Sequence, residues 1–186
     1  MWPWGHAAVG YLLYALLVRS NGRTPAGSSV IALGLGTQFP DLVDKPLGWT
    51  LGLLPGGRSL AHSLLTLTVL AAVLWYVGHR YRRQDLTFPF LFGSVSHVLS
   101  DGLYAALEGN YGDLSYLLWP VLPVPEADVE QSFLAHFAEL TLSSTVTFEI
   151  VLFVAATVIW VVDGAPGLWT LHAAGKEFAT RLASDG

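Results

Sequence analysis

The fold is decided by Leu64-Leu65-Thr66-Leu67-Thr68-Val69-Leu70-Ala71-Ala72-Val73-Leu74-Trp75, the centre of an apolar segment that covers residues 59–79. A membrane-spanning helix needs about 20 mostly apolar residues, and this segment meets that length. A second such stretch is Ile150-Val151-Leu152-Phe153-Val154-Ala155-Ala156-Thr157-Val158-Ile159-Trp160. Both stretches predict helices that cross a bilayer.

The composition also favours a membrane protein. The 186 residues are 53% hydrophobic and 12% charged, with a mean hydropathy of +0.51, whereas soluble domains carry roughly 25% charged residues. The length suits one domain, and the net charge of −5 argues against nucleic acid as a partner. The chain has no cysteine, which excludes disulfides and thiolate metal sites. Any metal ligand must therefore be His, Asp, Glu or water.

Further apolar segments predict the architecture. The apolar segments cover residues 4–19, 27–40, 59–79, 87–107 and 137–162, and a short helix at 113–119 and a surface helix at 168–182 are also expected. We predict an all-α, polytopic membrane bundle of about five membrane-embedded helices plus a C-terminal surface helix. Residues 1–165 form the embedded domain that carries the candidate site, and residues 166–186 form an amphipathic, cytoplasmic tail.

The basic residues predict the orientation, because cytoplasmic loops are enriched in Lys and Arg. With five spans, one side of the membrane holds Arg19, Arg23, Arg80, Arg82, Arg83, Lys176 and Arg181. The N-terminus is then outside and the C-terminus inside, in an inner or plasma membrane. No basic stretch precedes the first apolar segment, so we expect no cleaved signal peptide.

Ionisable residues within these segments are the candidate functional residues. Charged side chains are costly in lipid, and they usually pair, bind a metal or line a cavity. The candidates are His6, Asp41, Asp44, Arg58, His62, His97 and Asp101. The predicted topology places all of them in the outer half of the bundle, which predicts one outward-facing site.

Spacing gives each candidate two readings. His97 and Asp101, four residues apart, share one helix face and form either half of a metal site or a buried hydrogen bond that joins helices. Asp41 is read as a ligand, and Asp44 as a ligand or an orienting group, although aspartate is also common in turns. His6 alone would be a packing residue, and its significance comes from its neighbours.

The third helix is expected to begin near Ser59, which would serve as its N-cap. Arg58 and His62 then lie on its first turn. Arginine suits the binding of a phosphate or carboxylate, and the alternative for Arg58 is an anchor at the water interface. His136, Glu139 and Glu149 are further candidates that could complete a second metal shell; Glu149 has the alternative of a buried, protonated carboxyl.

These elements together resemble a known family. In chain order they are His6, Gly-x-x-x-Pro-Asp-x-x-Asp (residues 36–44), Arg-x-x-x-His-Ser (58–63), Ser-His-x-x-x-Asp (96–101) and Trp-Pro (119–120). The pattern, which covers about residues 1–120, resembles the YdjM-like family of LexA-binding, inner membrane-associated proteins assigned as metal-dependent hydrolases. The resemblance implies a metal site and, less directly, hydrolysis.

The order His, Asp, His, His-x-x-x-Asp is more distantly similar to zinc-dependent phospholipase C and the fungal single-strand nucleases. Those helical enzymes cleave phosphodiesters with a zinc cluster. Their later ligand pair is not matched, because His136-Phe137-Ala138-Glu139 is one residue shorter. One or two metals are therefore expected rather than three.

The leading hypothesis is a membrane-bound metal-dependent hydrolase of the phosphoester class. His6, Asp41, His62, His97 and Asp101 would bind a divalent ion, with zinc favoured over manganese or iron, and Arg58 and Asp44 would take catalytic roles. The substrate would be a phosphoester or lipid-linked molecule near the outer leaflet, with membrane lipid as the partner. The alternatives are a non-catalytic metal-stabilised scaffold or interaction protein and, last, an ion or proton transporter.

Overall fold

The apolar segments fold into helices in a computed structural model, which describes residues 1–124, 137–138 and 140–184. The seven α-helices of this part are α1 (Pro3–Ser20), α2 (Gly27–Lys45), α3 (Leu64–Arg80), α4 (Gln84–Asp101), α5 (Leu103–Glu108), α7 (Ser144–Val162) and α8 (Leu168–Ser184). A π-helical turn, η1 (Pro46–Thr50), extends α2, and a 3₁₀ helix, η2 (Tyr111–Leu118), follows α5. The described residues contain no strand, which confirms the predicted all-α class.

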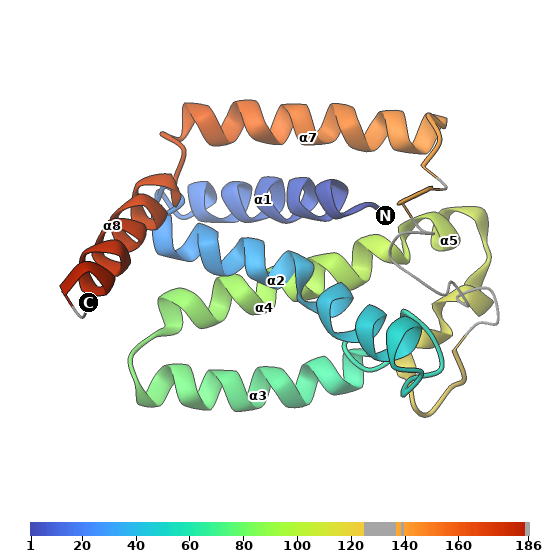
Figure 1. Cartoon of the computed structure of the whole chain (residues 1–186). Coiled ribbons are helices and arrows are strands. Elements are labelled where there is room, and N and C mark those ends of the chain that lie inside the picture. Colours follow the sequence, from blue (N-terminus) through green and yellow to red (C-terminus); the bar gives the residue numbers. More distant parts are fainter. Residues whose placement is uncertain (125–136, 139, 185–186) are drawn as a thin grey trace.

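Helices α2 and α4 form the central pair of the bundle (Figure 1). Helix α1 packs on both of them and on α7, and α3 packs on α4 from the other side. Helix α8 lies at the end where α1 finishes and α2 begins, whereas the N-terminus, α5, η1 and η2 gather at the opposite end (Figure 1). This second end holds the candidate site.

Two glycines let α2 and α4 touch backbone to backbone. A Cβ on Gly36 would lie 2.1 Å from the carbonyl oxygen of Phe90, and a Cβ on Gly93 would lie 2.5 Å from that of Leu33. No side chain fits at such distances, and small residues of this kind allow close helix contact in membranes. The contact brings the C-terminal half of α2 against the C-terminal half of α4.

An internal proline in each of these helices is matched by a serine on the other. Pro40 has no N–H to bond the carbonyl of Gly36, and this carbonyl accepts a hydrogen bond from Ser94 Oγ at 3.2 Å. Helix α4 repeats the arrangement at its own proline, where the Asp85 carbonyl accepts from Ser29 Oγ at 2.9 Å. In lipid every backbone carbonyl needs such a partner, so these pairs fix the register of the two helices.

Replacing Gly36 by alanine should destabilise the protein by about 1–3 kcal/mol, the usual cost of overpacking, because the new methyl group meets the backbone of Phe90. Gly34→Ala is the matched control on the same helix. A Cβ there meets nothing within 4 Å, so the helix propensity of alanine should stabilise the protein by up to about 1 kcal/mol. Thermal unfolding in detergent compares the two variants, and equal stabilities would contradict the helix contact.

The outer surface of the bundle is apolar. Among the described residues, two helices are long and apolar enough to cross a membrane, Gln84–Glu108 (α4 with α5) and Ser144–Val162 (α7), and α3 is apolar but shorter. Helices α3 and α7 expose large apolar side chains, namely Val69, Val73, Trp75, Tyr76, Val151, Val154 and Val158. Apolar surface on this scale marks a membrane or protein interaction surface.

Candidate metal centre

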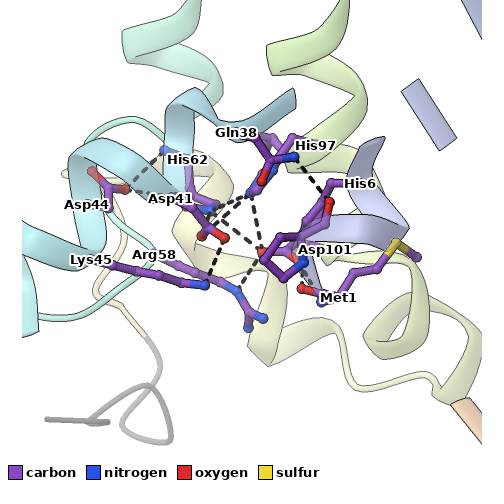
Figure 2. Close-up of polar contacts among 12 residues, drawn as sticks. Met1, His6, Gln38, Asp41, Asp44, Lys45, Arg58, His62, His97 and Asp101 are labelled. Carbon is purple, nitrogen blue, oxygen red and sulfur yellow. Dashed lines mark hydrogen bonds and ion pairs between the residues drawn. The ribbon is translucent and has the colours of Figure 1, made fainter. Parts of the chain in front are cut away.

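Four predicted ligands converge at the end of the bundle that holds the N-terminus (Figure 2). Asp41 comes from α2, His62 from the loop before α3, and His97 and Asp101 from the last turns of α4. One ligand atom of each residue lies within 4.8 Å of all the others. All four residues are buried, so the cluster is a preformed feature of the bundle.

The two histidines direct their Nε2 atoms at each other across 3.1 Å. His62 donates its Nδ1 proton to Asp44 at 2.9 Å, and His97 donates its Nδ1 proton to the Thr37 carbonyl at 2.7 Å. Because a carboxylate and a carbonyl can only accept, each neutral imidazole has a bare Nε2. Two lone pairs this close need a cation between them, either a metal ion or a proton on one ring.

The two carboxylates complete the donor set. Asp41 Oδ1 lies 3.6 Å from His62 Nε2 and 3.7 Å from His97 Nε2, and it is buried with no hydrogen-bond partner among the described residues. Asp101 Oδ2 lies 3.5 Å and 3.9 Å from the same nitrogens. Tetrahedral zinc with bonds of about 2.0–2.2 Å separates its ligand atoms by about 3.3–3.6 Å. The donor set therefore fits a zinc-sized ion.

Asp44 lies behind His62 and is not one of the four donors. Its carboxylate accepts hydrogen bonds from the backbone N–H groups of Ser59, Ala61 and His62, at 2.8 to 3.2 Å, and from the His62 ring. It thus shapes the loop and fixes the tautomer of His62, as an outer-shell carboxylate does for a metal-binding histidine. Of the two predicted roles, this geometry favours the orienting group.

The third helix begins later than predicted. Helix α3 starts at Leu64 and its N-cap is Ser63, so the prediction that Ser59 caps this helix is wrong. The backbone N–H of Ser59 is bound by Asp44 instead, which keeps this segment out of the helix. His62 therefore lies in the loop before the helix, and the loop brings it to α2 and α4.

Two cationic side chains reach the carboxylates of the cluster. Lys45 Nζ lies 2.7 Å from Asp41 Oδ2, and Arg58 Nε lies 2.8 Å from Asp101 Oδ2. Lys45 also lies over the ring of Trp49 at 5.1 Å. Figure 2 shows both side chains approaching the cluster from the same side. The sequence analysis missed Lys45, although its i, i+4 spacing from Asp41 was a signal for this pair.

His6 lies against the cluster without being one of its four donors. Its ring stacks on His97 with 3.6 Å between centroids. Its Nδ1 lies 2.9 Å from Ser100 Oγ, and its Nε2 lies 3.1 Å from Asp101 Oδ1. The amino group of Met1 contacts the same oxygen at 2.8 Å. These contacts hold Asp101 with its Oδ2 toward the two Nε2 atoms.

Glu149 is buried on α7 and accepts a hydrogen bond from the backbone N–H of Trp2 at 2.9 Å. It is close to the start of α1 but is not among the four donors. His136 and Glu139 lie outside the described residues.

A helical bundle with two span-length helices and a buried His/Asp cluster among its described residues is what a membrane protein with a candidate metal centre would have. The model of the family described as YdjM inner membrane protein matches residues 1–172, and the chain belongs to this family. The match includes every residue of the cluster and confirms the resemblance found in the sequence. No curated protein and no solved structure matches the chain.

Proposed function

We propose that this protein is a multi-pass, metal-dependent hydrolase of the inner membrane that acts on a phosphoester or lipid-linked substrate near the outer leaflet. One observation carries the proposal. Asp41 Oδ1 is buried and has no hydrogen-bond partner among the described residues, and it faces two imidazole nitrogens whose lone pairs also converge. A buried carboxylate oxygen without a partner is costly, and a metal ion removes that cost.

Asp41, His62, His97 and Asp101 are the proposed metal ligands. Their nitrogen and oxygen donors suit zinc best, with manganese or iron as alternatives. A divalent ion bound there would supply Lewis-acid activation of water and of a phosphoryl oxygen. Asp44 and His6 orient His62 and Asp101 respectively, through the hydrogen bonds and close contacts described above.

Arg58 and Lys45 support an anionic substrate. Both carry fixed positive charge to one side of the cluster, and arginine in particular matches the geometry of a phosphate group. Charge that develops on a phosphoryl oxygen during hydrolysis would be stabilised by donors already in place. A phosphoester therefore suits this site better than a neutral ester.

The proposed topology has the N-terminus outside and the C-terminus inside, with about five embedded helices in residues 1–165 and a cytoplasmic tail in residues 166–186. The distribution of Lys and Arg supports it, and so does the apolar outer face of α3 and α7. The site lies at the end of the bundle opposite α8 (Figure 1), so a cytoplasmic α8 implies an outward-facing site.

A metal-stabilised scaffold is the second candidate, and the number of donors favours it. Four protein donors fill a tetrahedral shell, whereas catalytic zinc sites keep one position for water. A catalytic site needs one coordination position on the metal ion that is open to water. Such a position exists if Asp101 stays paired with Arg58, or is shared between Arg58 and the ion. A crystal structure of the metal-loaded protein distinguishes the two, because only the enzyme has a water among the ligands.

Arg58→Gln should lower phosphate release from phosphatidic acid or an isoprenyl pyrophosphate in mixed micelles by about 10²–10³-fold, the usual effect of losing a preorganised donor. Arg58→Lys keeps the charge but loses the fork geometry of the guanidinium. Its rate of phosphate release should lie between those of the wild type and Arg58→Gln. At a saturating zinc concentration the metal content should be unchanged in both variants, because arginine is an outer-shell partner of Asp101 and not a ligand. Wild-type protein that binds metal but releases no phosphate from either lipid would favour the scaffold.

A further inference from the structure

An apolar cavity of about 320 Å³ lies between α1, α2 and α7. Pockets that hold small-molecule ligands in proteins have volumes of roughly 300–1,000 Å³. Small residues on all three helices create the space, and two aromatic side chains also line it: Ala7, Ala8, Gly34, Ala156, Tyr11 and Trp160. At Gly34 a Cβ would meet nothing within 4 Å, so this part of α2 faces open space.

The polar atoms around the cavity are all engaged elsewhere. The hydroxyl of Thr37 donates to Gly34 O, and the hydroxyl of Thr157 donates to Phe153 O, each within its own helix. The two aromatic side chains likewise turn their polar atoms to other partners: the Tyr11 hydroxyl donates to Asp163, and the Trp160 indole N–H donates to the Pro166 carbonyl. Among the described residues that line the cavity, no side-chain hydrogen-bond donor is left free, so a hydrocarbon suits this cavity as its occupant.

The cavity starts beside the candidate metal centre and extends away from it. On α1 its first lining residue, Ala7, follows His6 directly, and on α2 Thr37 lies one turn before Asp41. From Thr37 to Val30 the lining covers about 10 Å of helix at 1.5 Å per residue. Val30 is the fourth residue of α2, and Trp160 lies two residues before the end of α7, so the cavity runs from the middle of the bundle, about one turn from Asp41, toward the end that holds α8. A lipid whose head group is at the site would place the inner part of one tail in this cavity.

We infer that this cavity binds one hydrocarbon chain of a membrane lipid and positions the lipid's phosphate-bearing head at the metal centre. The inference rests on the proposed function and extends it, because it names the hydrocarbon chain as the part of the substrate that the cavity binds. An α-helix with side chains is about 10–12 Å across, so it takes up about 800–1,100 Å³ over a length of about 10 Å. The volume of the cavity is about 320 Å³. A single lipid chain fits this volume, and a helix of a partner or of a second copy does not.

The test uses the full-length protein in phosphatidylethanolamine vesicles that contain phosphatidic acid with a diazirine in the middle of one acyl chain. After irradiation, mass spectrometry locates the label. We expect label on the residues of α1, α2 and α7 that line the cavity. Gly34→Leu directs a side chain into the cavity, where a Cβ meets nothing within 4 Å, and should reduce this label about tenfold, the loss expected when roughly two methylene groups are excluded.

Gly175→Leu is the matched control, because a Cβ at Gly175 on α8 also meets nothing within 4 Å and lies away from the cavity. It should leave the label unchanged, and Gly34→Leu should keep its metal content and thermal stability. Label spread evenly over the exposed faces of α3 and α7 would overturn the inference. Cavity label that persists in Gly34→Leu, or crosslinks between two copies at the cavity, would overturn it as well. Cavity labelling in a protein that binds no metal would refute the proposed function alone.

Discussion

His97→Ala should abolish stoichiometric metal binding by the purified protein. The imidazole supplies one of four donors, and His62 Nε2 and Asp41 Oδ1 lie 3.1 Å and 3.7 Å from it. Loss of an outer-shell partner already costs 10–100-fold in metal affinity, so loss of a ligand should cost more than about 100-fold. Elemental analysis after gel filtration measures the ratio of metal to protein.

His79→Ala is the matched control for this experiment. His79 is exposed in the last turn of α3, where it bonds to Gln84, and it lies far along α3 from His62. This variant should keep the full metal content and stability. Equal metal content in the two variants would contradict the assignment of His97 as a ligand.

Asp44→Ala should be the most destabilising single substitution at the site. It leaves the buried backbone N–H groups of Ser59, Ala61 and His62 without their acceptor, and each such loss costs about 1–3 kcal/mol. The His62 ring also loses its orienting partner, so metal affinity should fall about 10–100-fold. Thermal unfolding with and without added zinc measures both effects.

Asp44→Asn tests the role of the charge, because it keeps the shape and one acceptor oxygen. It should lie between the wild type and Asp44→Ala in stability. Asp113→Ala removes an exposed carboxylate and should change neither quantity. If the Asp44→Ala variant is as stable as the Asp113→Ala variant, Asp44 does not organise the loop.

Hydrophobicity and spacing were enough to predict most of the fold and the ligand types. The apolar segments became helices, and the i, i+4 spacing of His97 and Asp101 placed both side chains at the cluster. That inference works because helix geometry is local and because charged residues are rare in such segments. The family match over residues 1–172 agrees with the motif order.

Long-range contacts were not readable from the sequence. The Thr37 carbonyl that orients His97 belongs to the backbone, so the residue type at position 37 does not indicate this contact. The later start of α3 depends on Asp44, 15 residues before Ser59, and local capping signals alone favoured the wrong serine. The i, i+4 spacing of Lys45 from Asp41 is visible in the sequence, but its meaning depends on Asp41 being a ligand.

The most direct test of the central claim is elemental analysis combined with X-ray absorption spectroscopy of wild-type protein purified without chelator. Four donor atoms within 4.8 Å of one another, from two histidines and two aspartates, predict about one divalent ion per chain with two imidazole ligands and otherwise oxygen. Protein that contains no divalent metal, and whose thermal unfolding does not shift when zinc, manganese or iron is added, would contradict the metal centre.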